Sequence, residues 1–203
     1  MERLLCLIIG YVFGMFQTGF IYGKINHKDI REHGSGNAGT TNTLRTLGKP
    51  AGYIVFLGDA LKAVFAVWIV RYLLFPGLGD VTKILETVTA LGVVIGHNYP
   101  FYMHFKGGKG IAATGGFMFA LDVRIALIAA IVFAVVFFTT RYVSVGSLTI
   151  TALFPILMLI FYPGQWVVFG LSLIFTALAW WRHRANIKRL MNGTENKFEK
   201  KKR

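Results

Sequence analysis

The chain has 203 residues, of which 55% are apolar and 15% are charged, against about 25% charged residues in an average soluble protein. This composition excludes a disordered chain and an ordinary soluble domain. A net charge of +13 on so apolar a chain favours a membrane protein over a nucleic-acid binder. The single cysteine, Cys6, excludes a disulfide framework, a CxxC redox pair and a cysteine-based zinc site.

Long apolar runs alternate with polar loops, and about 20 helical residues are needed to cross a bilayer. The first run, 4–22, is too long for a signal peptide and no cleavage site follows it, so we expect a retained helix. Further helices are predicted, in chain order, over 51–75, 84–99, 111–121, 125–139, 145–162 and 166–181.

The stretch 111–138 is divided because Asp122 and Arg124 lie in its middle, and charge at the bilayer centre is costly. The shorter helix, 111–121, would rise only about 16 Å, so it would need help from its neighbours to cross. If 111–138 were instead one helix, the charge asymmetry described next would shrink.

The basic residues are distributed unevenly between the two sides of a seven-helix chain. Loops 23–50, 99–110 and 140–144 and the C-terminal tail share one side and hold 17 of the 22 Lys and Arg residues. The positive-inside rule makes that side cytoplasmic and the N-terminus extracytoplasmic. We therefore predict an all-α integral membrane protein with seven transmembrane helices. Residues 1–195 would form a single polytopic domain, and 196–203 a basic tail that is disordered or rests on anionic lipid.

The first cytoplasmic loop contains Gly34-Ser35-Gly36-Asn37-Ala38-Gly39-Thr40-Thr41-Asn42, followed by Arg45. Glycines let backbone N–H groups converge on an anion, Ser, Thr and Asn add neutral donors, and Arg adds a bidentate cation. A flexible loop before a helix is the alternative. The pattern favours a phosphate site, although it is not a Walker A loop.

A second motif joins Gly96-His97-Asn98-Tyr99-Pro100 to Phe105-Lys106-Gly107-Gly108-Lys109-Gly110 directly before a helix. The N–H groups and the positive dipole end of that helix favour an anion. A basic turn that obeys the positive-inside rule would need the lysines but not the glycines, so we expect a second phosphate-contacting loop. His97 is either a ligand or base, or a histidine bonded to a neighbouring carbonyl.

A third motif follows the last apolar run, where His183 and Asn186 are three residues apart and share a helix face. A plain basic juxtamembrane helix explains the neighbouring arginines, but not these two residues or the Gly193-x-Glu195 ending.

Charged residues also occur inside the second apolar run, where Asp59 and Lys62 lie three residues apart and can pair. Such a pair is either functional or a buried structural pair. The H-x4-E spacing of His27 and Glu32 is most simply a chance match to the His–Asp base of other acyltransferases.

The three motifs together resemble one family, the bacterial integral-membrane acyl-phosphate:glycerol-3-phosphate acyltransferases. GSGNxGxxN occurs at residues 34–42, GHxxPxxxxFKGGKG at 96–110 and HRxNIxRLxxGxE at 183–195. The resemblance covers essentially the whole chain, although Ala63 stands where the family pattern has Gly. It implies seven helices, motif loops in the cytoplasm, and acyl transfer from acyl phosphate to the 1-hydroxyl of glycerol 3-phosphate, which gives lysophosphatidic acid.

The resemblance also implies roles for individual residues. We expect Ser35, Lys109 and His183 at the reaction centre, with Ser35 as a hydrogen-bond donor rather than a nucleophile. The base is either the substrate's own phosphate or His183. Substrate-binding residues are expected to be Gly36, Asn37, Gly39, Thr41, Asn42, Arg45, His97, Lys106, Gly107, Gly108, Gly110, Asn186 and Glu195.

The partners implied are acyl phosphate, glycerol 3-phosphate and membrane lipid, with no metal, cofactor or nucleic acid. The predicted location is the bacterial inner membrane, with the active site facing the cytoplasm. A carrier of an organic phosphate and a non-catalytic lipid-binding subunit are the competing classes, although the chain lacks the inverted repeats that transporters often show. The sequence sets neither acyl chain length nor oligomeric state.

Overall fold

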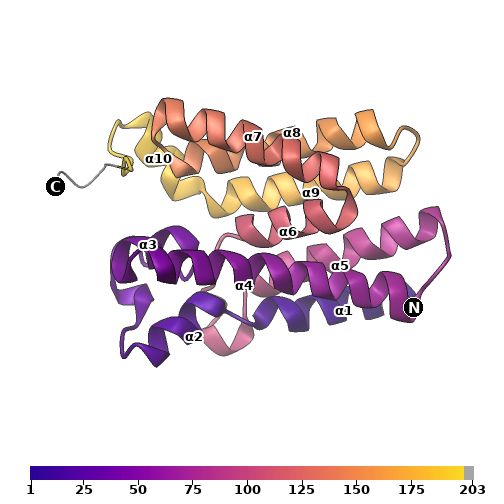
Figure 1. The fold of residues 1–203 in the computed structure, drawn as a ribbon, viewed down its shortest axis with the longest axis horizontal. Helices are drawn as coiled ribbons and strands as arrows, with labels where there is room; N and C mark the ends of the chain where they lie inside the picture. Colours follow the sequence, from indigo (N-terminus) through magenta and orange to yellow (C-terminus); the bar gives the residue numbers. More distant parts are fainter. Residues whose placement is uncertain (199–203) are drawn as a thin grey trace. The chain divides into compact units, whose positions relative to one another are not determined.

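The computed structural model describes residues 1–198 and contains helices but no strand within that range. The chain divides into two compact units, unit 1 from Met1 to Val123 and unit 2 from Arg124 onward (Figure 1). Each unit is described by itself below, and the expectation of a single membrane domain over 1–195 stays a prediction. The last five residues of the predicted basic tail, 199–203, lie outside the described residues.

Unit 1 carries the first two sequence motifs on short helices and loops between longer helices. Its α-helices are α1 (Glu2–Met15), α2 (Thr18–Ile25), α3 (Thr40–Leu47), α4 (Lys49–Trp68), α5 (Asp80–Asn98) and α6 (Ile111–Leu121). Three short segments complete it: the 3₁₀ turns η1 (Ile30–Glu32) and η3 (Phe101–Met103), and the π-helical turn η2 (Ile69–Leu74), which continues α4.

Unit 2 carries the third motif. Its helices are α7 (Val123–Thr140), α8 (Val143–Phe161), α9 (Trp166–Arg182) and α10 (Arg184–Met191). The division of 111–138 at Asp122 is confirmed, because α6 ends at Leu121 and Asp122 takes an extended conformation before α7. Pro155 lies inside α8, which continues to Phe161.

The prediction of one continuous helix over 4–22 is wrong, because α1 ends at Met15 and α2 begins at Thr18. Two buried polar side chains occupy the break. Gln17 Nε2 donates to the Gly14 carbonyl at 3.2 Å, and Lys62 Nζ donates to the carbonyls of Gly14 and Phe16 at 3.2 and 2.7 Å. These bonds satisfy carbonyls that the interrupted helix leaves unpaired.

Helices α1 and α5 approach closely through paired glycines. Gly10 and Gly14 lie one turn apart on α1, and Gly92 and Gly96 lie one turn apart on α5. A Cβ added at any of these four positions would overlap a backbone carbonyl of the facing helix. Two such small-xxx-small patterns let helix backbones pack at short range in a membrane. This contact fixes the ends of α1 and α5, where Gln17 and His97 lie.

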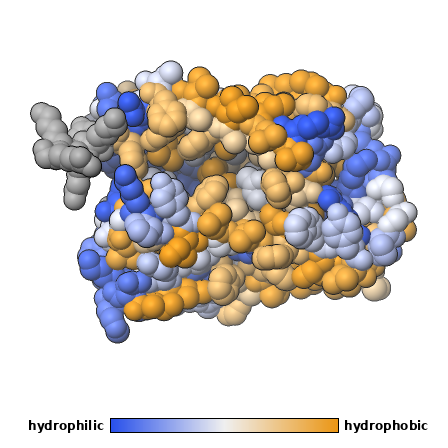
Figure 2. Space-filling view, in the orientation of Figure 1, coloured by the Kyte–Doolittle hydropathy of each residue, from blue (hydrophilic) through white to orange (hydrophobic). Residues whose placement is uncertain are grey.

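The helices have the apolar lengths and surfaces of a membrane protein. Within residues 1–198, four helical segments are long and apolar enough to span a membrane: Glu2–Ile25, Lys49–Leu74, Val123–Thr140 and Val143–Phe161. Shorter apolar helices are α6 and α9. On α7, a stripe of large apolar side chains is exposed, formed by Leu127, Ile131, Val135 and Phe138. Figure 2 shows apolar side chains over the middle of the helices and hydrophilic ones near their ends.

Candidate active site

The first motif loop of unit 1 is organised by the buried side chain of Asn42, the third residue of α3. Its Nδ2 donates to the carbonyls of Ile30 and His33 at 2.7 and 3.0 Å, and its Oδ1 accepts the Ser35 N–H at 2.8 Å. Asn42 is 1% exposed. The geometry therefore assigns Asn42 to holding the loop, while the exposed Ser35 and Arg45 lie at its surface.

The remaining residues of this loop lie between Ser35 and the start of α3. Asn37 Oδ1 accepts the N–H of Gly39 at 2.9 Å, in a turn that leads into the helix at Thr40. Asn37, Gly39 and Thr41 are partly exposed, and Gly36 is exposed. Because the first N–H groups of a helix have no carbonyl partner within it, this edge of the loop can receive an anion.

Asp29 and Arg31 form an ion pair at the start of the same loop. Arg31 binds the carboxylate of Asp29 through Nε at 3.0 Å and through its terminal nitrogen at 2.7 Å. The side-chain hydrogen bond from Arg31 lowers the pKa of Asp29 to about 2, although partial burial opposes it. The Arg31 side chain is therefore held by an ion pair within the loop. Arg45 follows the motif, on α3.

The second motif forms a turn that lies against the end of α5. The Gly107 N–H donates to the carbonyl of Asn98 at 3.1 Å, and the Gly108 N–H donates to that of His97 at 3.0 Å. Gly110 adopts a left-handed conformation, φ +79°, and caps the N-terminus of α6. The turn thus aims the first N–H groups of α6 at one place, the arrangement that binds phosphate in many proteins.

The two lysines of this turn differ in their surroundings. Lys109, inside the Gly-Gly-Lys-Gly turn, is half-buried, and Lys106, before it, is exposed. His97 is 3% exposed and lies beneath the turn, where its Nδ1 is 2.8 Å from Lys62 Nζ. The Asp59–Lys62 pair predicted from the sequence is confirmed, with a buried contact of 2.9 Å.

The two motif loops of unit 1 are held together by apolar side chains. Ile30 and Ala38 of the first loop form one buried cluster with Met103 of η3, the turn that precedes Lys106. Phe20 and Leu47 pack against this cluster. The structure therefore brings the first and second motifs to the same end of unit 1, as the positive-inside pattern predicted for their loops.

The third motif lies in unit 2, around the carboxylate of Glu195. Glu195 Oε1 accepts from Asn186 Nδ2 at 2.6 Å and from Ser144 Oγ at 3.0 Å, and Oε2 accepts from Arg189 Nε at 2.7 Å. Burial alone would raise the pKa of Glu195, but these three donors lower it below its usual value. Because Glu195 accepts bonds from Asn186 and Arg189, the geometry assigns it to holding α10 rather than to contact with a phosphate.

His183 lies at the junction of α9 and α10 and is 3% exposed. Its Nδ1 is 2.8 Å from the carbonyl oxygen of Ala179. A carbonyl oxygen only accepts, so the Nδ1 nitrogen carries the proton, and in the neutral ring the lone pair is at Nε2. His183 is the N-cap residue of α10 and Asn186 is the third residue of that helix, so their shared face stays a prediction.

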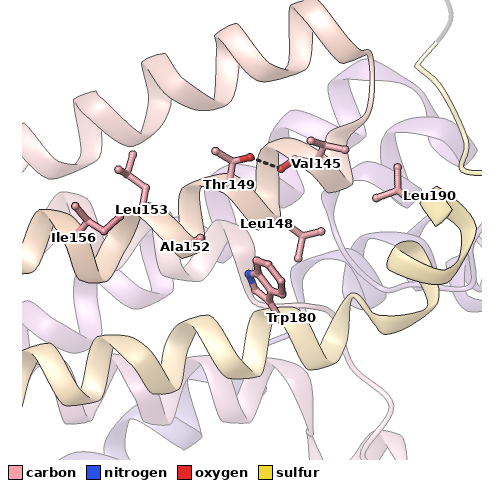
Figure 3. A pocket seen from close by; sticks show the side chains of 8 residues that line it. All are labelled: Val145, Leu148, Thr149, Ala152, Leu153, Ile156, Trp180 and Leu190. Atoms are coloured by element: carbon pink, nitrogen blue, oxygen red, sulfur yellow. Dashed lines mark hydrogen bonds between the residues drawn. The ribbon is translucent and has the colours of Figure 1, made fainter.

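An apolar groove of about 520 Å³ runs along α8 within unit 2 (Figure 3). Six α8 residues line it together with Trp180 of α9 and Leu190 of α10: Val145, Leu148, Thr149, Ala152, Leu153 and Ile156. The hydroxyl of Thr149 is bonded to the Val145 carbonyl at 2.9 Å, which leaves the lining apolar in character. Trp180 lies one turn before His183.

Sequence reasoning did not single out several residues that hold these sites. Gln17 had a signal, since it is a polar residue inside an apolar run, and Arg189 lies within the third motif. Ser144 had no signal, because its bond to Glu195 joins residues 51 positions apart. Among the described residues, no group of three or more His, Cys, Asp and Glu side chains could hold a metal ion.

Comparison with known proteins places these motifs in a family. The family model described as glycerol-3-phosphate acyltransferase matches residues 4–193. The chain belongs to this family. A glycerol-3-phosphate acyltransferase of Alkaliphilus metalliredigens is 40% identical over 99% of this chain and 98% of its own length. One of Clostridioides difficile is 43% identical over 96% of this chain and 95% of its own length.

Two solved structures of PlsY (YgiH), an integral membrane glycerol 3-phosphate acyltransferase, share the fold. Its glycerol 3-phosphate form matches with a TM-score of 0.89 and 36% identity, over 98% of this chain and 96% of that one. Its lysophosphatidic acid form matches with a TM-score of 0.87 and 35% identity over the same shares. The chain is therefore an all-helical membrane protein of the PlsY type.

Proposed function

We propose that this protein transfers a fatty acyl group from acyl phosphate to the 1-hydroxyl of glycerol 3-phosphate, giving lysophosphatidic acid and inorganic phosphate. The observation that carries the proposal is the 36% identity, over 98% of the chain, to the glycerol 3-phosphate form of PlsY. PlsY also has a lysophosphatidic acid form, and lysophosphatidic acid is the product of such a transfer.

The donor is inferred from the chemistry of the turn at 107–110. An acyl phosphate carries a phosphate next to the reacting carbonyl, and the α6 N-terminus with Lys109 suits that group. Phosphate is also a good leaving group, so the reaction needs no covalent acyl-enzyme. Ser35 is accordingly a donor to substrate oxygen. The family description and the names of the relatives give the acceptor, and the donor is our proposal.

The proposed reaction is addition to the acyl carbonyl followed by elimination of phosphate, with no acyl-enzyme. The 1-hydroxyl oxygen of glycerol 3-phosphate forms a bond to the acyl carbonyl carbon, and the carbonyl oxygen takes up negative charge. Lys109 and the first N–H groups of α6 stabilise that charge or the charge on the leaving phosphate. When the carbonyl re-forms, the bond from carbon to the phosphate oxygen breaks. The hydroxyl proton goes either to the phosphate of glycerol 3-phosphate or to Nε2 of His183.

Within unit 1, the exposed Ser35 and Arg45 are proposed to contact substrate oxygens. Within unit 2, His183 and Asn186 are the residues proposed to contact substrate. Asn37, Thr41 and Lys106 would complete the polar surface. Gly36, Gly39 and the glycines of the 107–110 turn would let the ligand approach the main chain closely, because they carry no side chain. In this proposal, the apolar groove along α8 receives the alkyl chain, since its lining is apolar apart from Thr149, whose hydroxyl is bonded within the helix. No cofactor enters the reaction.

We further propose that seven helices span the bacterial inner membrane, with an extracytoplasmic N-terminus and a cytoplasmic active site. The 17 basic residues on the loop side support this orientation. A reporter fused after Arg203 should be active only in the cytoplasm. The function is tested with purified protein in detergent: palmitoyl phosphate should serve as donor, and palmitoyl-CoA should not. Transfer from palmitoyl-CoA alone would contradict the proposed donor.

A further inference from the structure

The buried ammonium of Lys62 lies at a point where three helices of unit 1 meet: α1, α4 and α5. Lys62 is 5% exposed on α4. Its Nζ is 2.7 Å from the Phe16 carbonyl, 2.8 Å from His97 Nδ1, 2.9 Å from Asp59 Oδ1 and 3.2 Å from the Gly14 carbonyl. Removing a charge from water is expensive, so a buried cation persists only where it is paired and hydrogen-bonded.

The contact with Lys62 sets the orientation of the His97 ring. Two carbonyls and a carboxylate around Nζ can only accept, so the ammonium is the donor in this cluster. The ammonium has three N–H groups and no lone pair, so Nδ1 of His97 at 2.8 Å can only accept from it, and the more distant Gly14 carbonyl at 3.2 Å shares a donor. In the neutral ring the proton then lies on Nε2. Asp59, which balances the ammonium charge, is held in turn by Thr18 Oγ1 at 3.1 Å.

The oriented ring of His97 supports Gly108. A Cβ added at Gly108 would overlap Nε2 and come within 2.8 and 2.9 Å of Cε1 and Cδ2 of the same ring. The Gly108 main chain also donates to the His97 carbonyl at 3.0 Å. That carbonyl is fixed a second time by Gln17 Nε2 at 2.9 Å. A rotation of the imidazole would therefore displace the turn that lies on it.

We propose that Lys62 is a positioning residue, which acts through His97 to hold the Gly107–Gly110 turn in its anion-binding conformation. Lys62 does not touch substrate in this scheme, and His97 supports the turn from below. The ligand of the turn, the phosphate of an acyl phosphate, rests on the proposed function. The effect of Lys62 on the turn itself does not, because it follows from contacts within unit 1.

The same unit offers a matched control. Arg71 of η2 and the buried Glu86 of α5 form a bidentate ion pair, with both N–O distances at 2.6 Å. Arg71 also lies over the Tyr72 ring. Like Lys62, Arg71 joins the α4–η2 segment to a neighbouring helix through a charged side chain. It lies nine residues after Lys62 on that segment. Arg71→Met therefore reports the general cost of losing a buried ion pair.

The test compares hydrogen–deuterium exchange of residues 105–112 in the purified wild type, Lys62→Met, Lys62→Arg and Arg71→Met. Lys62→Met should speed exchange at Gly107 and Gly108 about 10-fold, a size typical of indirect coupling. Lys62→Arg should restore part of the protection, and Arg71→Met should change exchange less than about 2-fold. Unchanged exchange in Lys62→Met, or equal increases in both Met variants, would overturn the proposal.

Kinetics supply a second readout. Lys62→Met should raise the inhibition constant of inorganic phosphate and the KM for palmitoyl phosphate about 10-fold each, and leave the KM for glycerol 3-phosphate within about 2-fold. Equal increases in both KM values would count against the proposal. If the wild type fails to use palmitoyl phosphate, the proposed function is wrong, while the exchange comparison still decides the role of Lys62. If Lys62→Met does not accumulate in the membrane, Lys62→Gln replaces it in both measurements.

Discussion

Nδ1 of His183 lies 2.8 Å from the carbonyl oxygen of Ala179, one turn earlier in α9. This bond places the ring proton on Nδ1, so Nε2 can accept a proton when the ring is neutral and can donate only when the ring is charged. The two roles considered for His183 therefore have opposite pH dependence. A base must be neutral, and a donor to phosphate oxygen must be protonated.

His183→Gln should raise the KM for glycerol 3-phosphate more than it lowers kcat, because the substrate's own phosphate can take the proton. In the wild type, the KM for glycerol 3-phosphate should rise as increasing pH removes the imidazolium proton, and this dependence should be lost in the variant. Steady-state kinetics from pH 5.5 to 8.5 make the comparison. A kcat that instead falls on the acid side, with a loss of about 100-fold or more in the variant, would identify His183 as the base.

Lys109→Ala should reduce kcat/KM for palmitoyl phosphate by about 100-fold or more, because it removes a charged contact from a half-buried turn at a helix N-terminus. Lys106→Ala is the matched control, since Lys106 is exposed and lies outside that turn. Its effect should stay within about 5-fold. Small and equal effects of the two substitutions would show that the lysines of this loop only set the membrane orientation and do not bind phosphate.

The lowered pKa of Glu195 should make the thermal stability of the fold depend on pH. Its pKa in the folded protein lies below the ordinary value of 4.5, because Asn186, Arg189 and Ser144 donate to the carboxylate against the effect of burial. The carboxylate therefore stabilises the fold above about pH 4.5, and this contribution is lost as pH falls through the lowered pKa. Thermal unfolding in detergent should show a Tm that falls as the pH is lowered below about 4.5.

The Glu195→Gln variant should have a lower Tm than the wild type at pH 7 and a shallower decline in acid. Ser144→Ala, which removes one donor and keeps the charge, should show a smaller loss at pH 7. A Glu195→Gln variant as stable as the wild type at every pH would show that the carboxylate does not hold α10.

Gly92→Ala should destabilise unit 1 by about 1–3 kcal/mol, because the added methyl group overlaps the Leu7 carbonyl of α1. Gly115→Ala is the control, since a Cβ at that helical position of α6 meets nothing within 4 Å. It should be neutral or stabilising by up to about 1 kcal/mol. Unfolding in detergent measures both variants, and equal effects would exclude the close α1–α5 packing.

The sequence predicted the positions of the long helices because apolar runs and charges locate them directly. Asp122 divides α6 from α7, and the bounds of α6 agree with the predicted 111–121. The break between α1 and α2 was not predicted, because Gln17 and Thr18 are only two polar residues inside a long apolar run. At the break, Lys62, which lies 45 positions after Gln17, donates to the carbonyls of Gly14 and Phe16. That contact depends on packing rather than on the local sequence pattern.

In the candidate site, too, local pattern was predictable from the sequence and contacts between distant residues were not. The motifs predicted a set of candidate residues, but their spacing did not separate residues that can face a ligand from residues that hold the loops in place. Asn42 and Glu195 have donors or acceptors typical of a binding site, and the structure pairs both within their own unit. Such pairs join residues far apart in sequence, so spacing alone does not predict them. The paired glycines of α1 and α5, by contrast, had a readable pattern.

The groove along α8 predicts a dependence on acyl chain length. Ala152→Phe should narrow the groove and raise the KM for palmitoyl phosphate several-fold, while kinetics with butyryl phosphate stay unchanged, because a short chain does not need the full length of the groove. Val167→Phe, an exposed position on α9, is the control for added bulk. Equal effects on the long and short donors would show that the groove does not hold the alkyl chain.

The most direct test of the central claim is the stoichiometry of one reaction. Purified wild-type protein in detergent, given radiolabelled palmitoyl phosphate and glycerol 3-phosphate, should form lysophosphatidic acid and inorganic phosphate in equal amounts, with no label retained on the protein. Lys109→Ala, measured alongside, should form neither above background. Label trapped on Ser35, or phosphate released without lysophosphatidic acid, would contradict direct acyl transfer.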